Sequence, residues 1–184
     1  MAKPATAARA PQLAGNRFAN SAVSLEMAPP ASRLSLRANE KGVKSFERTL
    51  GFALPKKPKK SNSKGSRHAL WLGPDEWLII DEAKPDESLV PAKASPDFSA
   101  VDISHRNCAV IVSGIGAEAT LSAGCPQDLR LAAFPVGACS RTVFGKAEIA
   151  LYRTDEQTFR VEFWRSFAPY VWGYLSDAAR DAQF

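Results

Sequence analysis

Three residues of the stretch VDISHRNC, residues 101–108, are of the types that form an activated thiol nucleophile. Asp102, His105 and Cys108 follow one another at intervals of three residues. Such a site needs its histidine within about 3 Å of the thiol and a third group that orients the imidazole. On a regular strand, however, Asp102 and Cys108 point to one face and His105 to the other. The flanking β-branched residues and the run CAVIV favour a strand, so we interpret Cys108 as a core thiol.

Neither a metal site nor a phosphate-binding loop is indicated elsewhere. His68 and His105 lie in different halves of the chain, and the three cysteines include no CxxC pair with zinc-like spacing. The segment SGIGAEA places Gly114 and Gly116 before a predicted helix. No third glycine follows at the spacing of a dinucleotide loop, so a helix-capping turn is the better interpretation. We predict no catalytic, cofactor-binding or metal-binding residue in this chain.

The bulk composition indicates one globular domain of a protein that stays where it is made. The chain has 184 residues, of which 45% are hydrophobic, enough for a sizeable core. No apolar run is long enough to span a bilayer or to serve as a secretory signal. Cys108, Cys125 and Cys139 are odd in number and widely spaced, which suits free thiols in a reducing cytosol. We therefore expect a cytoplasmic protein without membrane contact.

The net charge of +5 raises the possibility of a nucleic-acid partner. Much of the positive charge lies in KKPKKSNSKGSR, residues 56–67, where proline, glycine and serine predict a flexible, solvated loop. A single-strand binder needs aromatic side chains interleaved with its cations, and this segment has none. Binding of RNA or another anion is the weaker hypothesis, and we expect no nucleic-acid partner.

The first half of the chain predicts an arm followed by a small set of strands and one helix. Residues 1–30 are rich in alanine and proline and show no period, so we predict an extended arm that is disordered or lies along a partner. Residues 32–38 alternate as a half-buried strand. Asn39 can cap a helix that ends at Gly51, with an apolar stripe between them. The segment HALWLGPDEWLII then predicts two strands around a turn.

The second half predicts a strand, a short helix, a three-stranded meander and a final helix. The strand is CAVIVSG and the short helix is IGAEATLSAG. The meander consists of two strands in ACSRTVFGKAEIALYR, which turn at Gly145, and a third strand in TFRVEFW. The last helix is predicted to begin at the cap residue Ser166, with Pro169 in its first turn. Its predicted core stripe comprises Phe167, Tyr170, Val171, Tyr174, Leu175 and Ala178.

Three apolar residues are candidates for contact with a partner protein. Trp172 lies roughly 130° from the predicted core stripe at 100° per residue, and tryptophan is enriched at interface hot spots. Phe18 and Leu25 lie in the predicted arm, where no element of their own would bury them. The alternative for Trp172 is a ring that packs on the surface of its own domain.

These elements indicate an α+β fold in which helices pack on antiparallel sheets. The order βαββ followed by ββαβββα suggests that the two halves are related βαββ-type units. We predict an N-terminal arm over residues 1–30 and a single domain over residues 31–184.

Several segments resemble a known family. They are similar to the gamma subunit of heterotetrameric sarcosine oxidase. The segments are ALWLGPDEWLII, VDISHRNCAVIVSGIGAEATLSAGCPQDL and FPVGACSRTVFGKAEIALYRTDEQTFRVEFWRSFAPYVWGYL. The similarity runs from about Arg33 to Tyr174 and is dense from Val101 onward. The family resemblance implies a cytoplasmic complex that oxidises sarcosine with O2 to glycine and hydrogen peroxide and passes the one-carbon unit to tetrahydrofolate.

The same resemblance implies where the cofactors and partners of such a complex lie. FAD, FMN, NAD and zinc belong to the other subunits, and the gamma subunit has no cofactor of its own. The partners are the alpha, beta and delta subunits, with alpha the most direct contact. The chain would then be a non-catalytic, structural subunit of an oxidoreductase.

The segment VDISHRNCAVIVSGIGAEATL also resembles the aminomethyltransferase of the glycine-cleavage system, the T-protein, which binds folate. The resemblance implies a fold built from ferredoxin-like βαββ units. Those transferases use an aspartate in a GGxxDD setting, whereas the comparable hairpin here reads FGKAEIALYR and offers only Glu148. A folate-dependent transferase activity of this chain is therefore the alternative function.

Overall fold

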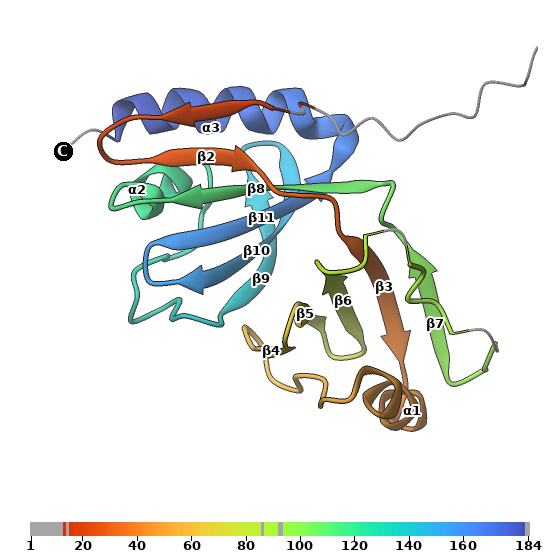
Figure 1. Ribbon diagram of the computed structural model, residues 1–184. Helices are drawn as coiled ribbons and strands as arrows, with labels where there is room; N and C mark the ends of the chain where they lie inside the picture. The colour runs from red at the N-terminus through yellow and green to blue at the C-terminus, as the bar shows by residue number, and fades with distance from the viewer. Residues whose placement is uncertain (1–12, 14, 86, 92–93, 183–184) are drawn as a thin grey trace, which may run out of the picture.

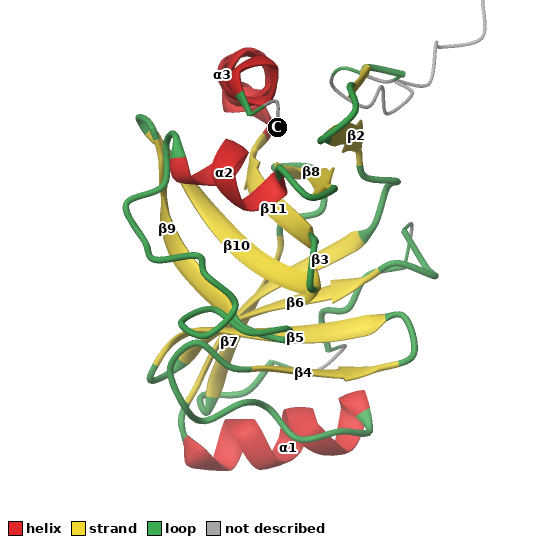
Figure 2. Cartoon of the chain, turned by 90° about the vertical axis from the view of Figure 1, so that its left-hand side faces the viewer, coloured by secondary structure: helices red, strands yellow, loops and turns green. Residues whose placement is uncertain are grey.

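The computed structural model describes residues 13, 15–85, 87–91 and 94–182, which form two antiparallel sheets. Sheet A has the strand order β1-β2-β8-β11-β10-β9, and sheet B has the order β4-β5-β6-β3-β7. The inner faces of the two sheets meet, α2 and α3 cover the outer face of sheet A, and α1 covers the outer face of sheet B (Figures 1 and 2). The arrangement is a four-layer α/β/β/α sandwich, and the predicted α+β class with packed helices is confirmed.

The strands and helices have the following bounds. Sheet A contains β1 (Arg17–Ala19), β2 (Ser24–Met27), β8 (Asn107–Ser113), β9 (Cys139–Phe144), β10 (Ala147–Asp155) and β11 (Thr158–Trp164). Sheet B contains β3 (Ser32–Ala38), β4 (Ser61–Lys64), β5 (Arg67–Gly73), β6 (Glu76–Asp81) and β7 (Phe98–Asp102). The helices are α1 (Glu40–Leu50), α2 (Ala117–Ser122) and α3 (Ala168–Asp181), the last preceded by the 3₁₀ turn η1 (Arg165–Phe167).

Both sheets are built from the same β-α-β-β-β order. In sheet B the chain runs through β3, α1, β4, β5 and β6, and β6 pairs back onto β3. In sheet A it runs through β8, α2, β9, β10 and β11, and β11 pairs back onto β8. One further strand pairs with the other side of each first strand, β7 beside β3 and β2 beside β8. The topology thus confirms that the two halves are related units, each with one strand more than the predicted βαββ.

Helix α1 forms as its capping residues predict. The Asn39 side chain accepts hydrogen bonds from the backbone N–H groups of Lys41 and Gly42, which satisfies two of the orphan donors of the first turn. Gly51 closes the helix at φ 77°, a left-handed conformation that glycine adopts without strain. The buried face of α1 lies on the outer face of sheet B.

The predicted arm is corrected over residues 17–27, which form the hairpin β1–β2 at one edge of sheet A. Strand β2 pairs antiparallel with β8, in the middle of the chain. Leu25 is fully buried in the core beneath α3. It therefore packs inside its own domain and is not exposed to a partner protein, in contrast to the prediction. Strand β2 has only four residues and no clear hydrophobic alternation. Its backbone hydrogen bonds to the distant strand β8 are what hold it in the sheet. Residues 1–12 of the predicted arm lie outside the described residues.

Helix α3 begins later than predicted, and its buried stripe includes Val171, Leu175 and Ala178 of the predicted set. Ser166 lies within η1 instead of capping the helix, although Pro169 is in the first turn as expected. Phe167 and Tyr170, predicted in the core, are 38% and 40% exposed. The buried stripe is made mainly of small residues because α3 packs closely on α2 and sheet A. Its members are Ala168, Val171, Leu175, Ala178, Ala179 and Ala182.

The basic segment, residues 56–67, is also more ordered than the predicted loop. Residues 61–64 form β4, the edge strand of sheet B, and the turn to β5 contains Gly65 at φ 60°. The hydroxyl of Ser61 donates to the carbonyl of Gly137 at 2.6 Å, which ties this edge to the loop before β9. The lysines of the segment are exposed. Among the described residues no helix is both long and apolar enough to cross a bilayer.

Two helical glycines predict opposite effects of the same substitution. A Cβ on Gly42 would lie 2.2 Å from the carbonyl oxygen of Asp97, so Gly42→Ala forces α1 away from its neighbour and should cost about 1–3 kcal/mol of unfolding free energy. A Cβ on Gly173 would meet nothing within 4 Å. Gly173→Ala should therefore stabilise the chain by about 0.5–1 kcal/mol through helix propensity. Urea unfolding of both variants checks the pair, and a shift of equal sign would contradict the packing described here.

Candidate functional site

The three residues with the chemistry of a thiol nucleophile lie on three different elements. Asp102 ends β7 in sheet B, His105 lies in the turn after it, and Cys108 lies on β8 in sheet A. The residues from Ile103 to Arg106 form the turn between these two strands, so the alternation of faces along a single regular strand does not apply to the three side chains. Burial, together with the nearby charge of Glu162, raises the pKa of the Cys108 thiol to about 12. Cys108 is a protonated thiol at neutral pH, the opposite of an activated nucleophile.

The other sequence-predicted elements also have structural partners. All three cysteines are free thiols, as predicted, and burial also raises the pKa of Cys139 to about 12. Within the described residues, no three His, Cys, Asp or Glu side chains lie close enough to hold a metal ion. Gly116 donates its N–H to the carbonyl of Ala22, and a Cβ on Gly114 would lie 2.3 Å from the same oxygen. The two glycines of SGIGAEA therefore allow close approach of the 20–23 loop.

The residues that matter most to the architecture form a buried ionic network between the two sheets. The Glu162 carboxylate on β11 accepts a hydrogen bond from Arg33 Nε on β3 at 2.6 Å and another from Arg160 Nε on β11 at 2.7 Å. The side chains of these three residues are at most 4% exposed. Arg160 also donates to Glu82, which follows β6. Two arginines and two carboxylates thus link the inner faces of sheets A and B.

The electrostatics of this network keep Glu162 ionised. Burial alone would raise the pKa of its carboxyl, but Arg33 and Arg160 together hold the pKa below the usual range. Both carboxylate oxygens already accept hydrogen bonds from guanidinium groups. A carboxylate held in this way is ionised near neutral pH and has no proton to donate.

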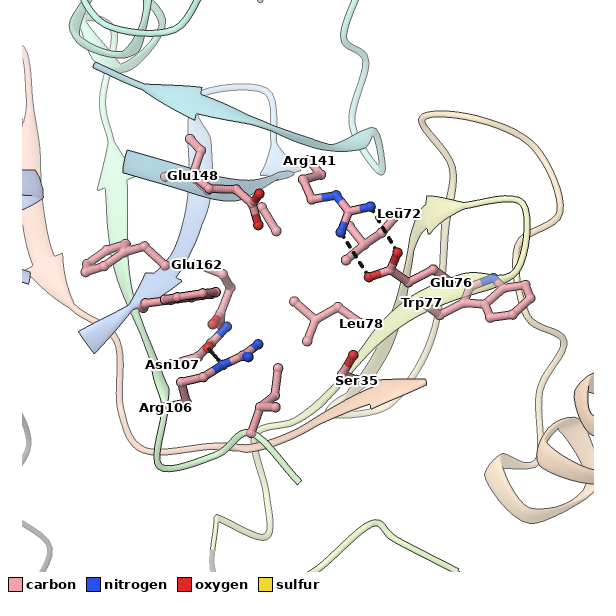
Figure 3. Close-up of a pocket in the computed structure, with 15 residues that line it drawn as sticks. Ser35, Leu72, Glu76, Trp77, Leu78, Arg106, Asn107, Arg141, Glu148 and Glu162 are labelled. Carbon is pink, nitrogen blue, oxygen red and sulfur yellow. Dashed lines mark hydrogen bonds and ion pairs between the residues drawn. The ribbon is translucent and has the colours of Figure 1, made fainter. Parts of the chain in front are cut away.

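The cleft between the sheets opens at one end, where a second group of charges lies (Figure 3). Arg141 on β9 makes two hydrogen bonds of 2.9 Å to the Glu76 carboxylate on β6, and Arg37 also pairs with this carboxylate. Burial would raise the pKa of Glu76, but the two arginines hold it below its usual value. Glu148, the residue of the alternative transferase hypothesis, is on the rim.

The cleft is too small for a cofactor. Its volume is about 60 Å³, whereas sites for drug-sized ligands and cofactors have volumes of roughly 300–1,000 Å³. Its walls are the inner faces of the two sheets, and the ion pairs Arg33–Glu162 and Arg141–Glu76 tie these faces together. The space holds a few water molecules and leaves no room for folate or a flavin beside Glu148.

The candidate interface residues differ in their exposure. Phe18 on β1 and Trp172 on α3 are half-buried and pack at the margin of the core of sheet A. The Arg180 guanidinium lies 5.6 Å from the centroid of the Phe18 ring. Trp172 lies roughly 70° from the centre of the buried stripe of α3 at 100° per residue, which explains its partial burial. Part of each side chain therefore remains exposed.

Sequence reasoning missed the network because its residues lie at positions that alternate with core residues. In TFRVEFW, Arg160 and Glu162 alternate with Phe159, Val161 and Phe163, a pattern typical of a strand with one face in water. Here that face is covered by sheet B. One signal was available in the sequence. Arg160 and Glu162 have opposite charges at positions i and i+2 of a strand, so their side chains lie next to each other on one face, where they can pair with a charged residue of a covering sheet.

The comparisons with known proteins point to one family. Residues 38–181 match the model of the family described as "Sarcosine oxidase, gamma subunit family". The sarcosine oxidase subunit gamma of Corynebacterium sp. (strain U-96) is 30% identical over 179 residues, which cover 95% of this chain and 85% of that protein. The sarcosine oxidase subunit gamma of Arthrobacter sp. is 29% identical over 136 residues, which cover 71% of this chain and 67% of that protein.

Two solved structures share the fold. The heterotetrameric sarcosine oxidase from Corynebacterium sp. U-96, in complex with pyrrole 2-carboxylate, contains a chain that matches with a TM-score of 0.78 at 24% identity, over 90% of this chain and 88% of that one. The glycine cleavage system aminomethyltransferase T from Bartonella henselae matches with a TM-score of 0.56 at 12% identity, over 84% of this chain and 45% of that one. The predicted relation to the aminomethyltransferase fold is confirmed.

Removal of the Glu162 charge is expected to weaken the contact between the sheets severely. Glu162→Gln leaves the buried Arg33 guanidinium without its counter-ion and Arg160 with Glu82 alone, and it should cost about 3 kcal/mol or more of unfolding free energy. The control is Glu26→Gln, which breaks the exposed pair with Arg17 and should cost less than about 1 kcal/mol. Chemical denaturation measures both. Equal losses would contradict the assigned role of the network.

The same network predicts how stability depends on pH. The folded-state pKa of Glu162 lies below the unfolded-state value near about 4.3, so its contribution is fully present above that value and is lost as the pH falls through the folded pKa. The unfolding free energy of the unmodified chain should therefore fall in this acid range. Glu162→Gln should show a shallower fall, and identical slopes would mean that the carboxylate is not the titrating group.

The raised pKa of Cys108 predicts low reactivity. An unperturbed thiol has a pKa of about 8.5, so at neutral pH the native Cys108 should be alkylated by iodoacetamide at least about a hundredfold more slowly than in the unfolded chain. Peptide mass spectrometry of timed samples measures the rate at each cysteine, with the urea-unfolded chain as control. Rapid labelling of native Cys108 would restore the thiol-nucleophile interpretation.

Proposed function

Because the chain belongs to the sarcosine oxidase gamma subunit family, we propose that it is the gamma subunit of a heterotetrameric sarcosine oxidase and has a structural role there. The observation that carries the proposal is the 30% identity to the gamma subunit of Corynebacterium sp. (strain U-96), which extends over 95% of this chain. The complex would oxidise sarcosine with O2 to glycine and hydrogen peroxide and pass the one-carbon unit to tetrahydrofolate.

The architecture supports a role without chemistry of its own. Both inner sheet faces are used to hold the two halves together, and the remaining cleft of about 60 Å³ is too small for a cofactor. The buried carboxylate Glu162 is neutralised by two arginines, and the Cys108 thiol stays protonated. FAD, FMN, NAD and zinc would then belong to the other subunits.

The partners would be the alpha, beta and delta subunits of a cytoplasmic complex, with alpha as the most direct contact. Phe18 and Trp172 are our candidates for residues that a partner covers, since each is half-buried at the margin of its own core. The variant Trp172→Ala distinguishes a ring that anchors a partner from a ring that packs only on its own domain. A partner anchor would weaken assembly, whereas a ring packed only on its own domain would lower the melting temperature of the free chain.

Purification of a tagged copy of this chain from cells that also express the other three subunits tests the proposal. We expect flavin-bearing subunits to co-purify, with sarcosine oxidase activity in the purified complex. The chain expressed alone should show no flavin absorbance and no turnover of sarcosine. A tagged chain that brings down no flavoprotein, or that oxidises sarcosine alone, would refute the proposed role.

A further inference from the structure

The exposed aromatic side chains gather at one end of sheet A. In the described part of the chain only Trp164, Phe167 and Tyr170 are exposed aromatic residues, at 43%, 38% and 40%. Val143, which is 41% exposed, faces Glu148 across β9 and β10 at the same end of the sheet. We call Val143, Trp164, Phe167 and Tyr170 the aromatic patch. The aromatic patch spans the end of β11, the turn η1, the start of α3 and the edge strand β9.

Contacts with the fold hold two of these rings in place. Trp164 is the last residue of β11 and faces Asn107 on β8, and the Arg106 guanidinium lies 4.8 Å from the centroid of its ring. The Tyr170 hydroxyl accepts a hydrogen bond from the backbone N–H of Lys146 at 3.0 Å, which fixes its ring over the β9–β10 turn. Rings that are already ordered lose little entropy on binding, so they form efficient docking contacts.

The rim of the aromatic patch has an excess of positive charge. Arg106 contacts the Trp164 ring and the side-chain oxygen of Asn107, and Arg165 donates to the carbonyl of His105 at 3.5 Å. These partners are uncharged, and the side chain of Lys146 adds a third exposed cation. Arg141 is neutralised by Glu76, and Glu148 is an exposed carboxylate in the lining of the cleft. A complementary surface would carry carboxylates around an apolar centre.

We propose that the aromatic patch docks onto another subunit of the oxidase complex, at a surface that is apolar in its centre and acidic at its rim. The inference rests on the proposed function, which supplies the partner. Trp, Tyr, Phe and Arg are the residues enriched in protein interfaces and their hot spots, and they make up most of the aromatic patch and its rim. Exposed apolar clusters on an isolated chain commonly mark such contacts.

The geometry favours a protein partner over a single-stranded nucleic acid. Nucleic-acid binding would need open ring faces on which bases stack. The Arg106 guanidinium already covers one face of Trp164, and the Tyr170 hydroxyl is held by the backbone of the β9–β10 turn. A flat docking surface has no such requirement, because it can cover the exposed ring edges and the guanidinium together.

All four subunits are co-expressed with the affinity tag on a partner subunit, and the amount of this chain that co-purifies with the tagged subunit is measured. We call this amount the retention of the chain. The variant Trp164→Ala/Phe167→Ala should reduce the retained chain at least about tenfold, since truncation of interface hot spots commonly has effects of this size. The matched control is Ile115→Ala/Leu131→Ala, which removes side chains that are 62% and 42% exposed elsewhere on the fold. Retention of the control should stay within about twofold of the unmodified chain.

A charge variant tests the rim without any change to the rings. Arg165→Glu should lower retention in low salt, because it places a carboxylate opposite the acidic rim of the partner. The control Arg48→Glu reverses an exposed charge on α1, at the opposite end of the molecule from α3 (Figure 2), and should have no effect. Arg165→Glu also guards against a folding defect in the double variant, since Arg165 is exposed in a short turn.

The outcomes separate this inference from the proposed function. Failure of the unmodified chain to be retained would overturn both. Full retention of Trp164→Ala/Phe167→Ala and of Arg165→Glu would overturn only the docking surface. Self-association of the free chain that the double variant abolishes, or nucleic acid released from the unmodified chain but not from the variant, would assign the aromatic patch to a different occupant and also overturn it.

Discussion

The Glu162 carboxylate, held between the guanidinium groups of Arg33 and Arg160, is the constraint on which the architecture depends. Apolar contact between the inner faces of the sheets has no preferred direction, so it would allow them to slide or rotate against each other. Two directed hydrogen bonds to a single carboxylate, one from each sheet, permit one arrangement. Desolvation of the three charges is costly, and an ion pair of this kind gives specificity of arrangement more than stability.

That arrangement determines where a function can lie. Each β-α-β-β-β unit covers the outer face of its sheet with helices and gives the inner face to the other unit. Little concave surface is left between them, and the Arg141–Glu76 pair lies at the mouth of the cleft that remains. A chain of this design has its helices and its sheet edges available for contact with other molecules.

Local signals predicted the elements that local interactions define. Helix α1 follows from Asn39 and Gly51, which act on backbone groups within a few residues. The β1–β2 hairpin, the residues that α3 buries and the ionic network depend on distant segments. Strand β2 exists because β8 pairs with it, and the small residues of α3 are buried because α2 lies against them. The alternation of Arg160 and Glu162 with core residues looked like a solvated face, because a single strand carries no information about the second sheet.

The pairing of β2 with β8 also has a consequence for how the chain folds. Residues 24–27 leave the ribosome long before residues 110–113, with which they form a ladder. All the strands of sheet B, up to β7, are synthesised in the interval, so this sheet can close while the N-terminal segment still has no edge to join. The pairing of β2 with β8 joins segments that are distant in sequence, so it forms late and slows folding. Sheet A is thus the last part of the nascent chain to be completed.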